Sequence, residues 1–314
     1  SQAKQSELLA KAAGARAETN LRLSLAAFGD VFDALVGRDP ALSLDEDPDT
    51  GEQTVVVHAP VNERDLVLLR KMLAFYDQFA SENLESQSLR YETARAYRRA
   101  GAIQSRLGEP SSLQEAETAF EKALDLFAGI NDRDVTRDLA TLHIDIGHLR
   151  ERQHQQPQAH ASFQEALALL QQLPSQDSPK AQLERAEVLF ELSRTKDSWS
   201  GRRGGGRGNV GRTQRPREEL RAAEQLLQSL VGSSPDDPKV RALQARVLME
   251  NVRRFDAHDD LDQVIKIWRE LVQSDPDMPE YRFQLCEALL DSASEGPGRS
   301  ASNKAESLAK LREA

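Results

Sequence analysis

Hydrophobic positions recur along most of the chain at the spacing of an α-helix. In the middle of the chain, Ala159, Phe163 and Ala166 are separated by four and then three residues, so they share one helix face. Gly147 lies twelve residues before Ala159, on the preceding helical stretch. A small residue on each helix lets the two backbones approach closely, and the phenylalanine fills the remaining space. Residues 134–173 are therefore predicted to form one helical hairpin.

This arrangement resembles the tetratricopeptide repeat (TPR), in which a glycine on the first helix and the set Ala-x3-Phe-x2-Ala on the second position the two helices. The stretch departs from the usual pattern at two places. His143 stands where an aromatic residue is usual, and Gln153 to Gln156 form a glutamine-rich turn where glycine is usual. The resemblance implies a stack of hairpins with a concave side lined mainly by first helices, because one hairpin cannot bury its own apolar face.

The hairpin pattern recurs along the chain. It predicts five approximate repeats, over residues 84–131, 133–175, 178–235, 237–276 and 278–314. Phe120, Phe163 and Trp268 hold equivalent positions on second helices. In the first repeat, Gly101 and Ala116 are farther apart along the chain than Gly147 and Ala159 are in the second. We therefore expect Pro110 to Leu113 to lengthen the turn of the first repeat. The pattern leaves the register of the first helices in the third and fourth repeats open.

One interval between repeats is too long. The second-helix positions Ala116, Ala159, Ala223 and Val264 are 43, 64 and 41 residues apart. The Gly/Arg-rich segment 197–217 is 21 residues long, which is the excess of the middle interval over the first. We therefore interpret 197–217 as an insertion in a turn; the alternative is that the two lengths agree by chance.

Residues 1–83 are predicted to form a short N-terminal helical segment with an acidic loop. The loop covers Asp39 to Glu52, Thr54 to Val57 is expected to be one short extended piece, and Asn62 is expected to cap a helix that reaches about Ala80. Before the loop, one helical stripe contains Leu21, Leu25, Phe28, Phe32 and Leu35. Over residues 84–314 the prediction is a TPR-like helical-hairpin solenoid, so the fold class is all-α. The first helices of the last three repeats are predicted to begin at Pro179, Pro238 and Pro279.

Composition agrees with stacked amphipathic helices. Hydrophobic residues make up 39%, aromatic residues 5% and charged residues 29% of the chain, whereas a β-sandwich would need more aromatic and β-branched residues. The net charge of −10 argues against a general nucleic-acid-binding surface. One cysteine, Cys286, excludes an intrachain disulfide, and no apolar run is long enough to span a membrane. Because the chain starts at Ser1 and stops in a helical pattern, we expect it to be cut from a longer protein.

Several longer stretches resemble the C-terminal region of planctomycete-type bacterial serine/threonine protein kinases. They are RAETNLRLSLAAFGDVFDAL, which ends at Leu35, RDLVLLRKMLAFYDQF from Arg64, YETARAYRRAGAIQSRLG from Tyr91 and PEYRFQLCEALL from Pro279. In that family a kinase domain comes first, usually followed by a membrane-spanning helix and then TPR repeats. The resemblance implies a non-catalytic repeat region of such a kinase, located in the cytoplasm or the cell envelope. The Gly/Arg-rich insertion is not part of the family pattern.

The sequence contains no complete catalytic set. Kinase catalysis needs a Gly-rich loop, a lysine on a strand, and HRD and DFG motifs, and these are absent in working form. Residues 206–211 match G-x-G-x-x-G literally, but a phosphate-binding loop of this type follows a strand, and this one lies in a run of glycine and arginine. We therefore expect no enzyme activity and no cofactor from this segment.

Metal and nucleic-acid sites are not expected either. His143 and His148 are five residues apart, and His154 and His160 are six apart, so neither pair has the i, i+4 spacing that places two imidazoles on one helix face. The Gly/Arg-rich segment contains Arg202, Arg203, Arg207 and Arg212, which could contact RNA. The interpretation we prefer is a loop that tolerates basic residues.

The concave face is the remaining candidate site. Alignment on Gly101 and Gly147 directs six side chains toward it: Arg95, Arg98, Arg106, Ile144, His148 and Arg152. Clustered guanidinium groups favour a protein or peptide partner, in particular an acidic one; the alternative is a solvated helix face paired with nearby glutamates. The leading hypothesis is a sensing or docking region of a kinase. A freestanding TPR scaffold and an RNA-associated protein are the alternatives.

Overall fold

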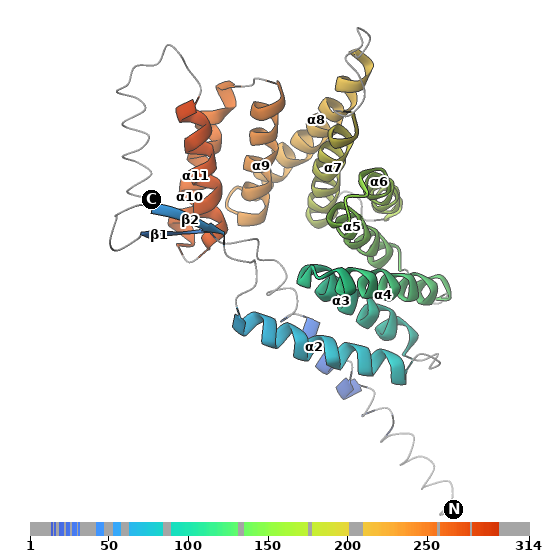
Figure 1. Ribbon diagram of the computed structural model, residues 1–314. Helices are drawn as coiled ribbons and strands as arrows, with labels where there is room; N and C mark the ends of the chain where they lie inside the picture. The colour runs from blue at the N-terminus through green and yellow to red at the C-terminus, as the bar shows by residue number, and fades with distance from the viewer. Residues whose placement is uncertain are drawn as a thin grey trace, which may run out of the picture. The chain divides into compact units, whose positions relative to one another are not determined.

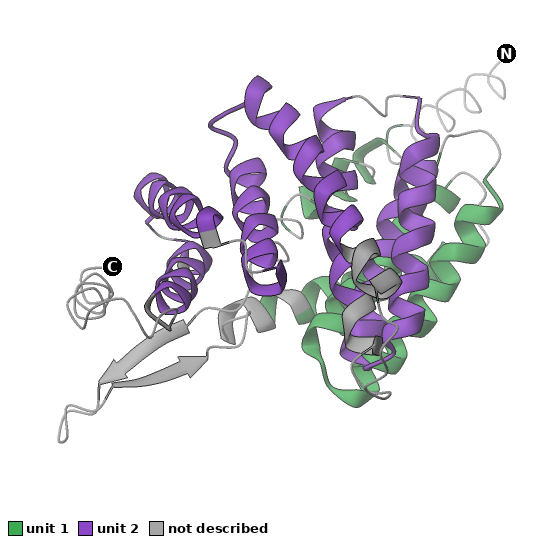
Figure 2. Ribbon diagram, turned by 90° about the horizontal axis from the view of Figure 1, so that it is seen from above, with its two compact units in different colours: residues 1–39, 60–135 green, residues 40–59, 136–314 purple. Residues whose placement is uncertain are grey.

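The structure is a computed structural model. It describes residues 14, 16, 19–21, 23–25, 27–29, 31, 42–46, 53–57, 63–83, 89–130, 135–174, 178–200, 210–255, 258–276 and 278–294. The chain divides into two compact units, which are coloured in Figure 2. Unit 1 contains residues 1–39 and 60–135, and unit 2 contains residues 40–59 and 136–314. The predicted all-α, TPR-like fold is confirmed within both units, with one small β-hairpin in addition.

Unit 1 contains the helices α2 (Glu63–Glu82), α3 (Arg90–Leu107) and α4 (Pro110–Ala128) (Figure 1). Helix α3 packs against both α2 and α4. The described residues between 14 and 31 are helical. Leu25 from this stretch is buried, its carbonyl oxygen accepts a hydrogen bond of 3.2 Å from Arg99, and the ring of Phe28 stacks on Phe75 with centroids 4.7 Å apart. Two residues of the predicted apolar stripe, Leu25 and Phe28, therefore contact α3 and α2. Phe32 and Leu35 of the stripe lie outside the described residues.

The turn between α3 and α4 is shorter than predicted. Gly108 adopts the left-handed conformation with φ of 71°, and its N–H donates to the carbonyl oxygen of Gln104, which ends α3. Pro110 then begins α4 at the first helical position. The expectation that Pro110 to Leu113 lengthen the turn is wrong, because these residues form the first turn of α4.

In its described residues, unit 2 contains three helical hairpins and a further helix. The first helices are α5 (Thr136–Arg152), α7 (Pro179–Ser200) and α9 (Pro238–Phe255), and the second helices are α6 (Gln156–Gln172), α8 (Val210–Ser233) and α10 (Leu261–Ser274), followed by α11 (Pro279–Ser294). A short 3-10 helix, η1 (His258–Asp260), precedes α10. Each helix packs against the next along the chain, as Figure 1 shows. One buried cluster joins α5, α6 and α7, a second joins α7, α8 and α9, and a third joins α9, α10 and α11. Every hairpin therefore completes its core with its neighbour.

The close approach predicted for the hairpins of Gly101 and Gly147 is confirmed. A Cβ atom placed on Gly147 would lie 2.6 Å from Cε1 of Phe163, and one placed on Gly101 would lie 2.6 Å from Cε1 of Phe120. Both rings are buried. Trp268 holds the equivalent position on α10 and is buried between α9 and α11. The glycine thus makes room for the aromatic ring of the second helix.

The predicted helix starts in unit 2 are confirmed as well. Helix α7 begins at Pro179, and the hydroxyl of Ser178 accepts a hydrogen bond of 3.3 Å from the N–H of Ala181. Helix α9 begins at Pro238, and Asp237 Oδ1 accepts a bond of 2.9 Å from the N–H of Lys239. Helix α11 begins at Pro279, while the rest of the predicted fifth repeat lies outside the described residues.

Two segments differ from the prediction. The acidic loop contains a strand, β1 (Leu42–Glu46), which pairs antiparallel with β2 (Gln53–Val57), with Leu42 opposite Val57. Leucine alternates with polar residues in β1, which is the period of a strand, so the prediction of one extended piece was incomplete. Around the Gly/Arg-rich segment, α7 continues to Ser200 and α8 begins at Val210, so helix extends into both ends of the predicted insertion. None of the described helices has the length and hydropathy needed to cross a membrane.

Candidate functional site

Ion pairs join the first helices of successive hairpins in unit 2. Arg137 on α5 pairs with Glu184 on α7. Arg246 on α9 lies 3.6 Å from Glu191 on α7. Arg253 on α9 donates to Asp291 on α11 at 2.9 Å. These pairs place polar side chains of α5, α7 and α9 on one surface. We define the first-helix face by His148, Glu151, Glu187, Glu191, Arg194 and Arg246.

Glu191 lies at the centre of the first-helix face. It is a buried carboxylate with 8% exposure, and such a group needs compensating charges. Arg194 supplies one, because its NH1 atom donates to Glu191 Oε2 at 2.8 Å, and Arg246 supplies the other. The guanidinium groups of these arginines also lie over the ring of Phe190, at 5.7 Å and 4.8 Å from its centroid. Both arginines are therefore held in place by a carboxylate and a ring.

His148 faces Glu191 from α5. Its Nδ1 atom lies 3.1 Å from Glu151 Oε2, and the ring meets Phe163 edge to face at 5.2 Å. One ligand-type atom from each of His148, Glu151 and Glu191 lies within 4.8 Å of the others. Burial lowers the pKa of His148, but the hydrogen bond to Glu151 and the negative charges of Glu191, Glu151 and Asp145 outweigh it, so the pKa is raised. The local field on this part of the face is negative.

The first-helix face is open to solvent at three charged positions. The side chains of His148 and Arg194 are 41% and 44% exposed, and Glu187 is exposed as well. Burial of part of each group nevertheless opposes its charged form, and it raises the pKa of Glu187. A partner could therefore reach these side chains on the surface formed by α5 and α7, with Arg246 of α9 beside them.

The six residues predicted for the groove fall in both units. Arg95, Arg98 and Arg106 are half-buried on α3 of unit 1, and the guanidinium group of Arg95 lies over the ring of Tyr91 at 5.7 Å. In unit 2, His148 is on the first-helix face, Ile144 packs against the buried cluster of α5, α6 and α7, and Arg152 is exposed at the end of α5. A groove shared by both sets of residues stays a prediction.

Sequence reasoning missed the residues that α7 and α9 contribute. Glu187, Glu191, Arg194 and Arg246 belong to the two first helices whose register the repeat pattern left open. The i, i+4 and i+3 spacing of Glu187, Glu191 and Arg194 was visible in the sequence. What it could not show was that His148 lies opposite, since these residues are some forty positions away in the chain.

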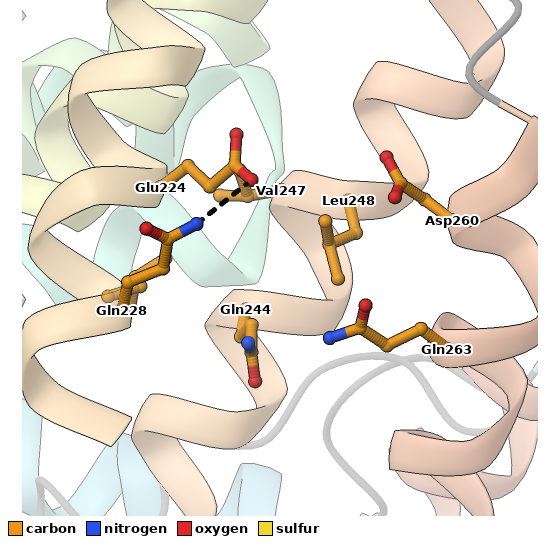
Figure 3. A pocket seen from close by; sticks show the side chains of 8 residues that line it. Glu224, Gln228, Gln244, Val247, Leu248, Asp260 and Gln263 are labelled. Atoms are coloured by element: carbon orange, nitrogen blue, oxygen red, sulfur yellow. Dashed lines mark hydrogen bonds between the residues drawn. The ribbon is translucent and has the colours of Figure 1, made fainter. Parts of the chain in front are cut away.

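A pocket lies between α8, α9 and α10 (Figure 3). Its volume is about 140 Å³, and it is lined by Glu224, Leu227, Gln228, Gln244, Val247, Leu248, Asp260 and Gln263. Gln228 donates to Glu224 at 3.3 Å, and Gln263 extends from α10 toward α9. On α9, Gln244 and Leu248 lie on the side opposite Arg246, because helical residues repeat every 3.6 positions. This pocket is therefore separate from the first-helix face.

The structure describes the Gly/Arg-rich segment only at its two ends. Arg202, Arg203 and Arg207 lie outside the described residues, and Arg212 lies in α8. Of the literal G-x-G-x-x-G match, residues 206–209 lie outside the described residues, and Val210 and Gly211 belong to α8.

No family model matches this chain, and no curated protein matches it. Among solved structures, the chain is similar to BtubC (BKLC) from P. vanneervenii, with a TM-score of 0.50, 11% identity, and coverage of 80% of this chain and 89% of that one. It is also similar to YrrB, described as a TPR protein with an unusual peptide-binding site (TM-score 0.37, 16% identity, 76% and 91% coverage), and to Pseudomonas aeruginosa pilF (TM-score 0.30, 14% identity, 77% and 99% coverage). At 11% identity the first likeness concerns the fold alone, and the other two scores are too low to carry an argument.

Proposed function

We propose that this chain is a non-catalytic protein-interaction module that binds a peptide or protein segment on the first-helix face of unit 2. The observation that carries the proposal is that α5, α7 and α9 place charged side chains that solvent reaches on one surface, joined by ion pairs between the helices. Stacked helical repeats commonly bind their partners on a concave surface formed by such helices.

The chemistry of the first-helix face fits a partner that carries both charges. Arg194 is 44% exposed and can donate to a carboxylate. Glu187 is exposed; burial of part of the group raises its pKa, Glu184 and Glu191 add to this, and Arg246 and Lys239 oppose it, so the carboxyl group can accept a hydrogen bond from a cationic side chain of a partner. The acidic partner predicted from the sequence is proposed for α3 of unit 1, through Arg95 and Arg98.

The first test is a peptide selection followed by matched variants. Peptides selected from a random displayed library would be titrated against the chain and against Arg194→Gln. We expect the variant to lose roughly tenfold or more in affinity, because a charge-assisted hydrogen bond contributes about 1.5–3 kcal/mol. Arg269→Gln, at an exposed position on α10, is the control and should bind like the parent chain. Equal binding by both variants would refute the assignment of the first-helix face.

The site on α3 needs its own test. Reversing both Arg95 and Arg98 to Glu should abolish binding of an acidic peptide and leave the helical circular dichroism unchanged. Binding of the parent chain should weaken as salt rises, because exposed charges are screened over about 8–10 Å. An acidic peptide that binds the double variant as well as the parent chain would exclude α3.

We also propose, from the resemblance of the N-terminal and repeat segments, that the module serves a bacterial serine/threonine protein kinase as its sensing or docking region. The gene sequence upstream of Ser1 tests this directly. A kinase domain encoded in frame there would support the proposal. A complete gene without one would favour the freestanding TPR scaffold.

A further inference from the structure

We propose that His148, Glu151 and Glu191 form a binding site for a divalent transition-metal ion, with Zn²⁺ as the best match. One imidazole nitrogen and two carboxylate oxygens, the atoms that zinc takes from these residue types, lie within 4.8 Å of one another. The ligands come from two different hairpins, α5 and α7. The inference does not depend on the proposed peptide-binding function.

The geometry of the pair on α5 suits a metal ion. His148 and Glu151 are three residues apart, so they share one face of the helix. The 3.1 Å between His148 Nδ1 and Glu151 Oε2 is close to the roughly 3.3 Å that separates two ligands of a tetrahedral zinc ion with bonds of about 2.0 Å. Glu191 faces this pair from α7 and completes three protein ligands, which leaves the fourth position of a tetrahedral ion for water.

Two carboxylates supply negative charge to the site. Glu151 and Glu191 both lie in the cluster with His148, and burial of Glu191 limits the competition from water. Two arginines compete with the ion for Glu191. Arg194 bonds to Oε2 at 2.8 Å and can remain there as an outer partner that orients the carboxylate. Arg246 lies 3.6 Å from Oε1, beyond hydrogen-bonding distance, so Oε1 is the oxygen that an ion would take.

The spacing of residues in the sequence could not identify this metal site. Pairs of histidines gave no metal motif, because the set contains only one histidine and its third member lies 43 residues farther along the chain. An ion bound to α5 and α7 together would link two successive hairpins. It would therefore raise the thermal midpoint of the chain, since a ligand of the folded state stabilises that state by mass action.

The test is calorimetric titration of the metal-free 314-residue chain with ZnCl₂. We expect one ion per chain. His148→Gln and Glu191→Gln should each weaken binding by at least about 10–100-fold, which is the loss seen when even outer-shell partners are removed. Arg246→Met should strengthen binding, because it removes the cation that competes for Oε1. The control is His154→Asn, at an exposed histidine that is not a member of the cluster, which should bind like the parent chain.

Two further measurements keep the test decisive. Co²⁺ in place of Zn²⁺ should give the visible absorption of a tetrahedral site in the parent chain and lose it in His148→Gln. If Glu191→Gln disturbs folding, Glu151→Gln replaces it, because Glu151 is not the central carboxylate of the face. Zinc binding that is equally strong in the parent chain, His148→Gln and Glu151→Gln would overturn the proposal, and so would the absence of stoichiometric binding or of any rise in thermal midpoint with zinc.

Discussion

Replacing Gly147 by alanine tests the packing principle of the hairpins. The added Cβ atom would meet Cε1, Cζ and Cδ1 of Phe163 at 2.6, 2.7 and 2.9 Å. Real Cβ atoms do not approach this closely, and the ring of Phe163 is fully buried, so it cannot turn out into solvent. Forcing extra volume into a packed core costs about 1–3 kcal/mol. The same substitution removes a helical glycine, which contributes about 0.5–1 kcal/mol in the opposite direction.

A second glycine separates these two effects. Gly232, also in a helix, has nothing within 4 Å of its added Cβ atom, so Gly232→Ala contains only the helix-propensity gain. The difference between Gly147→Ala and Gly232→Ala therefore isolates the steric cost of about 1–3 kcal/mol. Thermal and denaturant unfolding followed by circular dichroism would measure it. Equal stability of the two variants would refute the reasoning.

The clash can also be relieved by design. All three nearest atoms at Gly147 belong to Phe163, so adding Phe163→Leu to Gly147→Ala should recover part of the lost stability. At Gly101 the backbone oxygen of Ala116 lies 3.1 Å from the added Cβ atom, in addition to two ring atoms of Phe120. The corresponding rescue by Phe120→Leu should be less complete, because a backbone atom cannot be trimmed. A double-mutant cycle at each site would compare them.

Three further predictions concern other residues. Trp268→Ala should cost about 3–5 kcal/mol in the free energy of unfolding, whereas Leu290→Ala, at a position with 53% exposure, should cost well under that in the same denaturant titration. His154 adopts φ of 58° in the turn between α5 and α6, so His154→Gly should raise stability by about 0.5–1 kcal/mol, measured as a higher thermal midpoint. Burial lowers the pKa of His143, opposed by Glu165 and assisted by Arg150. The unfolded chain therefore binds a proton at this position more readily than the folded chain. The stability advantage of the parent over His143→Gln should be full above the unfolded pKa of about 6.5 and shrink as pH falls below it. An advantage that grows on acidification would contradict the assignment.

The packing within each hairpin could be predicted because it depends on neighbours along the chain. The spacing of Ala159, Phe163 and Ala166 sets one helix face, and Gly147 is close enough in sequence to belong to the adjoining helix. The structure confirms the contact between Gly147 and Phe163. Helix starts were predictable for the same reason, since a capping side chain such as Asp237 acts on N–H groups two and three residues ahead.

Other local features were mistaken because two signals competed. Strand β1 has alternating leucines, but it also has two acidic residues and lies in an acidic stretch, so the charge pattern outweighed the strand pattern. At the first hairpin, Pro110 by itself predicts a longer turn after Gly108. A proline at the first helical position is equally compatible with a two-residue turn, and the left-handed Gly108 makes that turn possible.

The first-helix face depends on a different kind of information. His148 and Glu191 are 43 residues apart, and their separation in space depends on how one hairpin is rotated on the next. That rotation is set by the buried clusters between hairpins, such as the one that contains both Val188 of α7 and Phe163 of α6. The buried residues must fit one another, while the residues on the solvent-exposed face of the same helix are only required to be polar. A repeat pattern therefore constrains the scaffold and leaves the polar face free to vary, so the face holds the residues that give one such chain its own partner or ion.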